Sequence, residues 1–267
     1  MHANIENSNF DILFPNTLSS IKIPKISAQV LDGNFELNQN IIYFNDKSAF
    51  LYYGNILNYE NPQNIDFNLT GELNTNDIIK FIGKETMSFW KTRGNIPLEV
   101  IFKGNNIKQT FFAELKADKD NYITPVDFSM LQNLNTSIQA LVDFKPNRIK
   151  IKDTGLYTRA SIIDDNNRKI VIKNKIAGIE GTIEGDRINL IKIDIPKTLT
   201  GKMVILPKSN FDIDNTVLYI YGKTISPLIK GSLIIKNILI PELSSKINSV
   251  NLNLKKDELI FNLKNIM

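Results

Sequence analysis

The sequence has no cysteine and only one histidine, His2, in 267 residues. Without cysteine the chain cannot form disulfides, thiolate nucleophiles or cysteine-ligated metal sites. With a single histidine close to its N-terminus, it also lacks the residues for a Ser-His-Asp triad, a Cys-His pair or a histidine-based metal site. Enzyme classes that depend on these groups are therefore excluded by residue type.

Long apolar runs are missing as well. No uninterrupted apolar stretch approaches the roughly 20 residues that a membrane-spanning helix needs. The first 16 residues, MHANIENSNFDILFPN, have neither the basic n-region nor the apolar h-region of a signal peptide. The sequence reads as that of a soluble chain, or as part of a longer protein whose anchor lies elsewhere.

The charge is modest and dispersed. The 32 Lys and Arg residues are spread among 28 Asp and Glu residues, which gives a net charge of +4. No basic stripe marks a nucleic-acid interface, so we expect no nucleic-acid partner. Hydrophobic residues make up 42% of the chain, a globular balance that is sufficient for a substantial core.

Alternation of apolar and polar residues dominates the sequence. This period of two predicts half-buried strands, each with one apolar face. The clearest alternating segments are residues 34–44, 65–70, 98–103, 111–116, 149–152, 250–254 and 259–264. We therefore predict a mainly β, antiparallel fold.

Turn residues and a few helical signals punctuate these segments. Residues 32–34, 103–106, 164–167 and 184–187 are rich in Gly, Asn and Asp, which favour hairpin turns. The alternation changes phase between Leu190 and Ile191, which predicts a β-bulge. Short helices are predicted over residues 74–83, 124–134 and 241–247. We expect residues 1–20 to flank the sheet and residues 21–267 to form it, with room for two sub-units meeting near residues 145–180.

The acidic residues do not assemble into a recognisable site. A segment beginning at Asp118 starts like a calcium loop, but Ile123 replaces the turn glycine and Ser129 the bidentate glutamate. The acidic pairs at 164–165 and 212–214 fit solvated turns. Trp90 fits a rim or core aromatic at a strand entrance better than a ligand platform. We predict no catalytic residue, metal or cofactor.

The apolar face of such a sheet is the remaining functional candidate. It must be covered either by the sheet folding over itself or by a ligand, and both options remain open. Each fully buried Leu, Ile or Phe gains about 1.5–3 kcal/mol, so an uncovered groove would accept acyl chains. The candidate groove residues are Phe67, Leu69, Val100, Phe102, Phe111, Leu115, Leu252, Leu254, Leu259, Phe261 and Leu263.

Two regions of the sequence resemble the AsmA-like family of Gram-negative envelope proteins, which includes the YhdP and TamB types. One is residues 222–266, where glycine-led strands pass into the Ile-Pro-Glu-Leu segment and then into further alternating strands. The other is FNLTGELNTNDIIKFIGKE followed by RGNIPLEVIFKGNNIKQTFFAELKAD, where a glycine-containing strand precedes a short helix and a new sheet unit. The resemblance covers most of the chain from about Ile21.

The resemblance implies an elongated, curved, U-shaped sheet with an apolar groove that conducts phospholipids between inner and outer membranes. It implies a non-enzymatic protein of the periplasm, associated with the inner membrane in its parent form. Its expected partners are phospholipid acyl chains and either neighbouring segments of a longer AsmA-like chain or envelope proteins. Because the membrane-spanning helix of the family is missing and the sequence stops within a strand pattern, we expect an internal or truncated segment.

Two other functions remain open at this stage. The first is a structural module whose unpaired strand edges add strands from neighbouring segments or partners. The second is an envelope enzyme acting on polysaccharide through an unrecognised pair of carboxylates.

Overall fold

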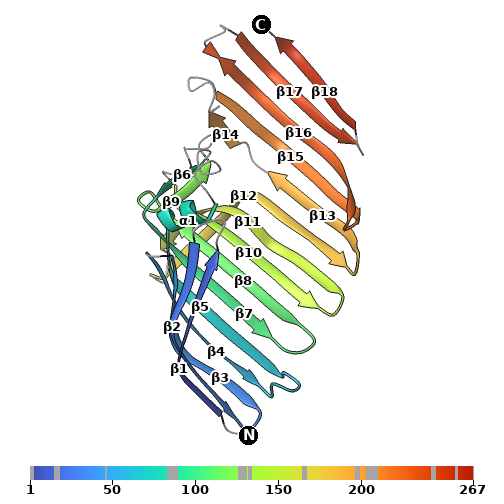
Figure 1. The fold of residues 1–267 in the computed structure, drawn as a ribbon. Helices are drawn as coiled ribbons and strands as arrows, with labels where there is room; N and C mark the ends of the chain where they lie inside the picture. The colour runs from blue at the N-terminus through green and yellow to red at the C-terminus, as the bar shows by residue number, and fades with distance from the viewer. Residues whose placement is uncertain are drawn as a thin grey trace. The chain divides into compact units, whose positions relative to one another are not determined.

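The computed structural model describes residues 3–14, 19–45, 47–82, 90–125, 131, 134–163, 167–195, 199–202, 210–241, 245–255 and 258–266. Over these residues the protein is mainly β, with one α-helix (Figure 1). The prediction of a mainly β, antiparallel fold is confirmed.

The strands follow the alternating segments of the sequence. They are β1 (Ala3–Phe14), β2 (Ser19–Leu31), β3 (Asn34–Phe44), β4 (Ser48–Leu57), β5 (Asn64–Asn74), β6 (Trp90–Arg93), β7 (Asn95–Gly104), β8 (Gln109–Ala117), β9 (Tyr122–Pro125), β10 (Thr136–Lys145), β11 (Arg148–Ile163), β12 (Lys169–Glu184), β13 (Arg187–Ile195), β14 (Leu199–Lys202), β15 (Asn210–Lys223), β16 (Ser226–Ile240), β17 (Ser245–Lys255) and β18 (Glu258–Ile266). The helix α1 is Thr75–Ile82.

Strands that are consecutive in sequence are mostly neighbours in the sheet. The order in the 16-stranded sheet is β1-β2-β3-β4-β5-β7-β8-β10-β11-β12-β13-β15-β16-β17-β18, with β14 pairing with β15. β6 and β9 form a separate two-stranded sheet. Short local connections of this kind are typical of an antiparallel meander.

Two of the predicted turns show why the hairpins close where they do. Asp32 and Gly33 both have positive φ angles, 48° and 81°, as a two-residue type I′ turn requires. Gly185 also has a positive φ, 57°, between the paired residues Glu184 and Arg187. The predicted turn at 164–167 lies outside the described residues except for Asn167.

The predicted bulge in β13 is confirmed. Thr182 pairs with Leu190 and Ile183 with Ile188, so Asn189 is the extra residue of the bulge. The same irregularity appears on the other side of β13, between its pairings to β15. The phase change in the sequence is therefore absorbed locally, and apolar residues before and after it stay on one face.

Of the three predicted helices, one is confirmed. α1 matches the prediction for residues 74–83, although Gly83 lies outside the described residues. Asn74 caps it, since its Oδ1 accepts a hydrogen bond of 3.0 Å from the backbone N–H of Asn76. For the prediction over 124–134, residues 126–130 and 132–133 are outside the described part of the chain and β9 takes residues 124–125.

The helix predicted over residues 241–247 is wrong at its C-terminal end. β17 begins at Ser245, and residues 245–247 pair with the end of β16. From Ile247 onward, apolar and polar residues alternate as in a strand, and β17 extends the sheet beside β16. This strand pairing outweighs the local helix preference of residues 245–247. Residues 242–244 are not among the described residues.

The acidic residues 212–214 were predicted to lie in a turn, but they lie within β15. Asp212 and Asp214 alternate with Phe211 and Ile213, so both carboxylates point to one side of the strand. Asp214 is paired with Lys236 on β16, and Asp212 accepts a hydrogen bond from Asn237 Nδ2 at 2.8 Å. Cross-strand partners thus replace the expected solvation.

The chain divides into two units. Unit 1 consists of Met1–Ile123 and Ala140–Pro146, and unit 2 of Thr124–Gln139 and Asn147–Met267. β1 pairs with β2, so residues 3–14 belong to the sheet of unit 1, where the sequence had suggested a flanking segment. Each unit is described by itself below.

A buried polar cluster fixes α1 against unit 1. Asp77 is fully buried, and its Oδ2 accepts hydrogen bonds from the backbone N–H groups of Lys47 and Ser48 and from Ser48 Oγ. Asn45 Nδ2 donates to the backbone oxygen of Asp77 at 3.2 Å. These contacts join the start of α1 to the β3–β4 turn, and only the acidic residue in the first helical turn could be read from the sequence.

Aromatic packing completes the attachment of α1. The ring of Phe81 makes edge-to-face contacts with Phe14 and Phe44, with centroid distances of 6.0 and 5.6 Å. Ile78 on α1 is buried, and Ile96 on β7 is fully buried. Buried apolar side chains thus accompany the polar cluster beside α1.

Candidate functional site

The apolar residues of unit 1 form a continuous face over four neighbouring strands. The strand register places Phe67, Phe102 and Phe111 directly opposite one another on β5, β7 and β8. The next row joins Leu69, Val100 and Ala113, and the row after it joins Gly71, Leu98 and Leu115. All six candidate residues of unit 1 therefore share this face, which we call the apolar face of unit 1.

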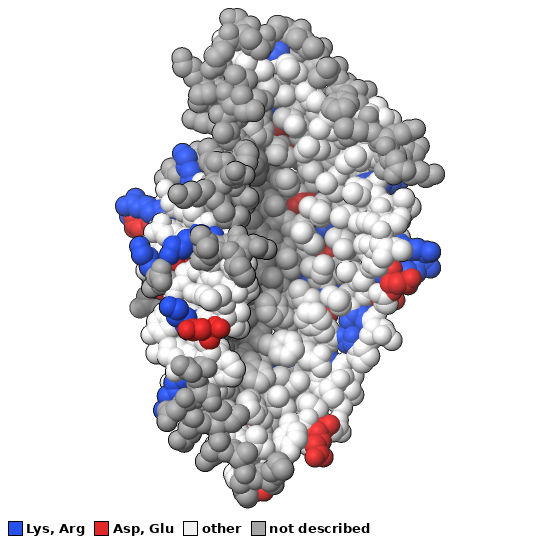
Figure 2. Space-filling model, viewed as in Figure 1, with Lys and Arg blue, Asp and Glu red and all other residues white. Residues whose placement is uncertain are grey.

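No charged residue occupies this face on β4, β5, β7 or β8. Its positions are Ser48, Phe50, Tyr52, Gly54 and Ile56 on β4, Ile65, Phe67, Leu69, Gly71 and Leu73 on β5, Ile96, Leu98, Val100, Phe102 and Gly104 on β7, and Gln109, Phe111, Ala113, Leu115 and Ala117 on β8. On the face turned toward the viewer in Figure 2, charged side chains lie mainly along the margins.

The charged residues of these strands lie on the opposite face and pair there. Lys103 lies 3.3 Å from Asp66, directly across the β5–β7 ladder. Lys116 lies 3.0 Å from Glu99 and 3.6 Å from Glu114. The apolar face therefore carries no charged side chain, and its polar side chains are the neutral Ser48, Tyr52 and Gln109; the Tyr52 hydroxyl is buried without a hydrogen-bond partner among the described residues.

Burial differs along the apolar face. Phe50, Ile96 and Ala117, at the end beside α1, are buried. The central residues, including Phe67 and Val100, are only half-buried although strands flank them on both sides. Since their lateral neighbours are in place, the remaining exposure lies toward the face itself.

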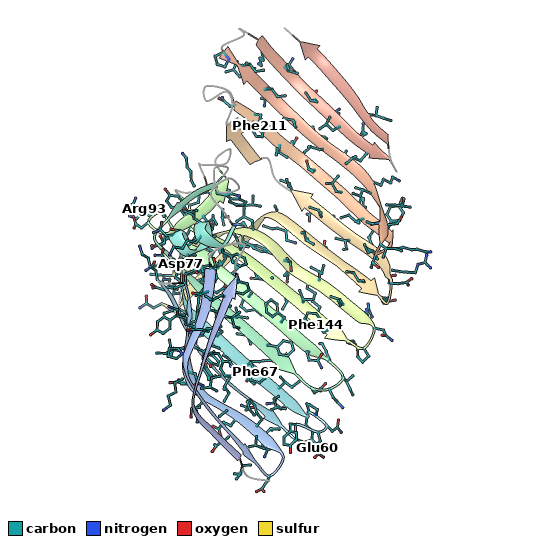
Figure 3. The ribbon with its side chains drawn as sticks, in the orientation of Figure 1. Glu60, Phe67, Asp77, Arg93, Phe144 and Phe211 are labelled. Atoms are coloured by element: carbon teal, nitrogen blue, oxygen red, sulfur yellow. The ribbon has the colours of Figure 1, made fainter. Side chains whose placement is uncertain are left out.

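Two aromatic side chains on this face lie over cross-strand glycines. A Cβ placed on Gly54 would come within 2.3 Å of Phe67 Cδ1, and one on Gly71 within 2.7 Å of Phe50 Cδ1. Both pairs are direct partners in the β4–β5 register. Phe67 therefore packs within the sheet, and Figure 3 shows its position on β5.

Unit 2 carries a second apolar face, which we call the apolar face of unit 2. Leu252 pairs with Leu233 on one side and with Phe261 on the other, and Leu254 pairs with Gly231 and Leu259. Leu263 pairs with Val250 in the next row. The five candidates of unit 2 thus share one face in register, although the side chains of Leu259, Phe261 and Leu263 are not among those described.

This second face continues through the preceding strands. In successive rows, Ile183 pairs with Ile188, Gly181 with Ile191, and Ile179 with Ile193. Ile191 and Ile193 pair in turn with Ile220 and Leu218 on β15. Sequence reasoning did not include these residues among the candidates, although the apolar alternation over residues 188–195 was visible.

The polar face of unit 2 holds two buried ionisable groups. Asp194 and Tyr157 are 8% and 7% exposed, and neither Asp194 Oδ1 nor the Tyr157 hydroxyl has a hydrogen-bond partner among the described residues. Lys192 lies 3.7 Å from Asp194 and 3.8 Å from Glu180. Burial, assisted by the negative charges of Asp153, Asp194 and Glu180, raises the pKa of Tyr157 above 10.0.

The described residues contain no group of three or more His, Cys, Asp and Glu side chains placed to hold a metal ion. Among the same residues, no helix has the length and apolar character needed to cross a membrane. Trp90 lies at the start of β6 and is partly exposed, and the Asp118 segment forms a turn in which Asp118 Oδ1 accepts hydrogen bonds from Asp120 and Asn121.

The geometry therefore provides two uncharged apolar faces and no assembled catalytic group in the described residues. Such faces can bind apolar ligands through burial of hydrocarbon. The resemblance to AsmA-like proteins rests on the sequence pattern, because comparison of the chain with protein-family models, curated proteins and solved structures finds no match.

Proposed function

We propose that this chain is a non-enzymatic lipid-handling protein that holds phospholipid acyl chains against its apolar faces. The observation that carries the proposal is the uncharged face across β4, β5, β7 and β8, whose central side chains remain half-buried. Completing the burial of each such side chain contributes up to about 1.5–3 kcal/mol, so several in one row would hold an acyl chain. On this proposal the faces curve into grooves that line a path for lipid.

The proposal extends to the cellular role that the family resemblance implies. We propose that the chain acts in the envelope of a Gram-negative cell, as a segment of an AsmA-like protein that passes phospholipid between membranes. The uncharged faces of both units support this role, because a lipid path requires hydrocarbon-compatible surface along successive strands.

The test is whether phospholipid co-purifies with the protein. Two variants introduce the same aspartate, one on the apolar face of unit 1 and one on the opposite face of the same strand. Val100 and Ile101 are neighbours on β7, both half-buried, and their side chains lie on opposite faces. The chain is expressed with an export signal, and its native mass is compared with its denatured mass. We expect bound phospholipid in the wild type, its loss in Val100→Asp and its retention in Ile101→Asp.

A second pair of variants covers unit 2. Leu252 lies on the apolar face and Asn253 on the opposite face of β17. Leu252→Asp should weaken lipid binding while Asn253→Asp should not, and circular dichroism verifies that each variant retains its β structure. A wild-type protein that is folded and free of lipid would contradict the proposal.

A second candidate function is strand-edge assembly. Among the described residues, β1 and β18 each have a partner on one side only. An open edge can pair with a strand of another molecule. Assembly that rises with protein concentration in the absence of lipid would favour this function over lipid binding.

A further inference from the structure

The hairpin of β11 and β12 extends beyond the strands next to it. β12 pairs with β13 only over Gly178–Glu184, whereas its pairing with β11 continues to Lys169. On the other side, the backbone N–H of Arg159 donates to Asn135, which precedes β10. Residues 158–163 and 169–175 therefore form a two-stranded extension of unit 2, which we call the arm.

The arm exposes large aliphatic side chains on both faces. The exposed fractions are 46% for Ile162, 71% for Ile163, 43% for Ile170, 50% for Val171 and 40% for Ile172. A two-stranded hairpin without a covering layer is marginally stable in water, and a cluster of exposed aliphatic residues marks an interaction site.

The two faces of the arm differ in chemistry. Register places Ala160, Ile162, Ile170 and Ile172 together on one face. This face continues the apolar face of unit 2, because Leu156 and Ala177 precede it in the same alternation after the irregularity at Tyr157. One polar row, Thr158 paired with Asn174, separates the apolar residues of the arm from those of the sheet.

The other face combines cations with aliphatic residues. It carries Arg159, Lys169 and Lys173 interleaved with Ile163 and Val171. Arg159 Nε donates to the backbone oxygen of Thr136 at 3.2 Å and Lys173 Nζ to Gln139 Oε1 at 2.9 Å, and these bonds hold the base of the arm to β10. Of the three cations on this face, Lys169 lies nearest the end of the hairpin, opposite Ile163.

The arm carries a net positive charge. Residues 158–175 contain five Lys or Arg and two Asp, a net of three positive charges in a chain whose total is +4. A bilayer containing anionic phospholipid offers both phosphate groups for the cations and hydrocarbon for the isoleucines. Contact between the cationic faces of two copies would instead oppose like charges.

We propose that the arm docks this chain onto the surface of an anionic phospholipid bilayer. The aliphatic residues enter the interface, and the Lys169 side chain extends to the phosphates. This membrane contact goes beyond acyl-chain binding by the apolar faces and does not depend on it.

Flotation with vesicles tests the proposal in the full chain. We expect the protein to float with vesicles of phosphatidylglycerol and phosphatidylcholine and not with phosphatidylcholine alone, and added salt should weaken the binding. Removing one cation from a membrane surface weakens binding about fivefold, so Lys169→Glu should reduce the affinity at least that much. Ile163→Ser combined with Val171→Ser should abolish flotation.

Matched controls come from another hairpin of unit 2. Ile225 is 91% exposed in the β15–β16 turn, beside Lys223 at the end of β15. Ile225→Ser and Lys223→Glu change the same chemistry outside the arm and should leave flotation unchanged. Equal effects of arm and control variants would overturn the proposal, as would equal binding to both vesicle types.

A fluorescence readout separates membrane insertion from other effects. Trp90 is the single tryptophan, so Ile163→Trp and Ile225→Trp are each placed in a Trp90→Phe chain. Anionic vesicles should shift the emission of the first to shorter wavelength and leave the second unchanged. If the arm variants instead change the oligomeric state without vesicles, the arm contacts a second copy and the proposal fails. Leu252→Asp should lose bound lipid but should still float with anionic vesicles. Failure of acyl-chain binding by the apolar faces can therefore be distinguished from failure of bilayer docking by the arm.

Discussion

Asp77 Oδ2 lies 2.7 Å from Ser48 Oγ and 2.8 Å from the backbone nitrogen of Ser48, in a site where both residues are fully buried. The same hydroxyl oxygen accepts a hydrogen bond of 2.9 Å from the backbone nitrogen of Asn74. Ser48 thus links the carboxylate of α1 to the residue that caps α1.

Asp77→Ala should therefore destabilise unit 1 strongly. It leaves the N–H groups of Lys47 and Ser48 without their acceptor, and each unsatisfied buried donor costs about 1–3 kcal/mol. Asp77→Asn keeps one acceptor oxygen and should cost less. Denaturant unfolding measures both variants, and a loss in Asp77→Ala no larger than in the surface control Glu72→Ala would contradict the assigned role.

Gly54→Val should destabilise the sheet even though valine favours strands. The added side chain meets Phe67 Cδ1 and, at 2.5 Å from the new Cβ, the backbone oxygen of Asp66. Overpacking of this kind costs about 1–3 kcal/mol. The control is Gly33→Asn, which lies in open space and keeps a residue type that tolerates positive φ. Equal unfolding midpoints for the two variants would show that the ring of Phe67 moves freely.

Alkaline pH should reduce stability through Tyr157. Its folded pKa is raised above 10.0 because burial and nearby negative charges disfavour the phenolate. The stabilisation is complete below the unfolded pKa of about 10 and is lost as pH rises through the folded pKa. Tyr157→Phe should flatten this loss in unfolding free energies measured on either side of that range. An alkaline profile of Tyr157→Phe identical to that of the wild type would contradict this prediction.

The local features of the fold could be predicted from the sequence. Alternation fixed which residues of β5, β7 and β8 share a face, since side-chain direction in a strand has a period of two. The Asp-Gly turn at 32–33 and the bulge beside Leu190 followed from local residue preferences. The candidate residues Phe67, Phe102 and Phe111 share a face for the same reason; the β7–β8 hairpin sets the pairing of Phe102 with Phe111, whereas the pairing of Phe67 with Phe102 spans the segment that contains α1 and β6.

Features that depend on distant residues could not be predicted. The burial of Asp77 arises from Asn45 and Ser48, which lie 29 or more residues earlier and offer no sequence signal of their own. Asp212 and Asp214 resembled a turn because their partners, Lys236 and Asn237, lie on another strand. The arm could not be predicted for a related reason. Alternation predicts which face of a strand is apolar, but the lengths of the neighbouring strands determine whether β11 and β12 have further strands beside them.

Side-chain direction in this sheet repeats every two residues, and Asn189 in the bulge stands outside that repeat. Inserting one residue within a regular strand such as β7 would exchange every later side chain of that strand between the faces. Deleting Asn189 would instead leave Ile188 and Ile191 in phase, because the bulge already sets that residue apart from the pairing. Single-residue insertions and deletions in natural variants should therefore be tolerated at Asn189 and in hairpin turns, and eliminated elsewhere in the strands.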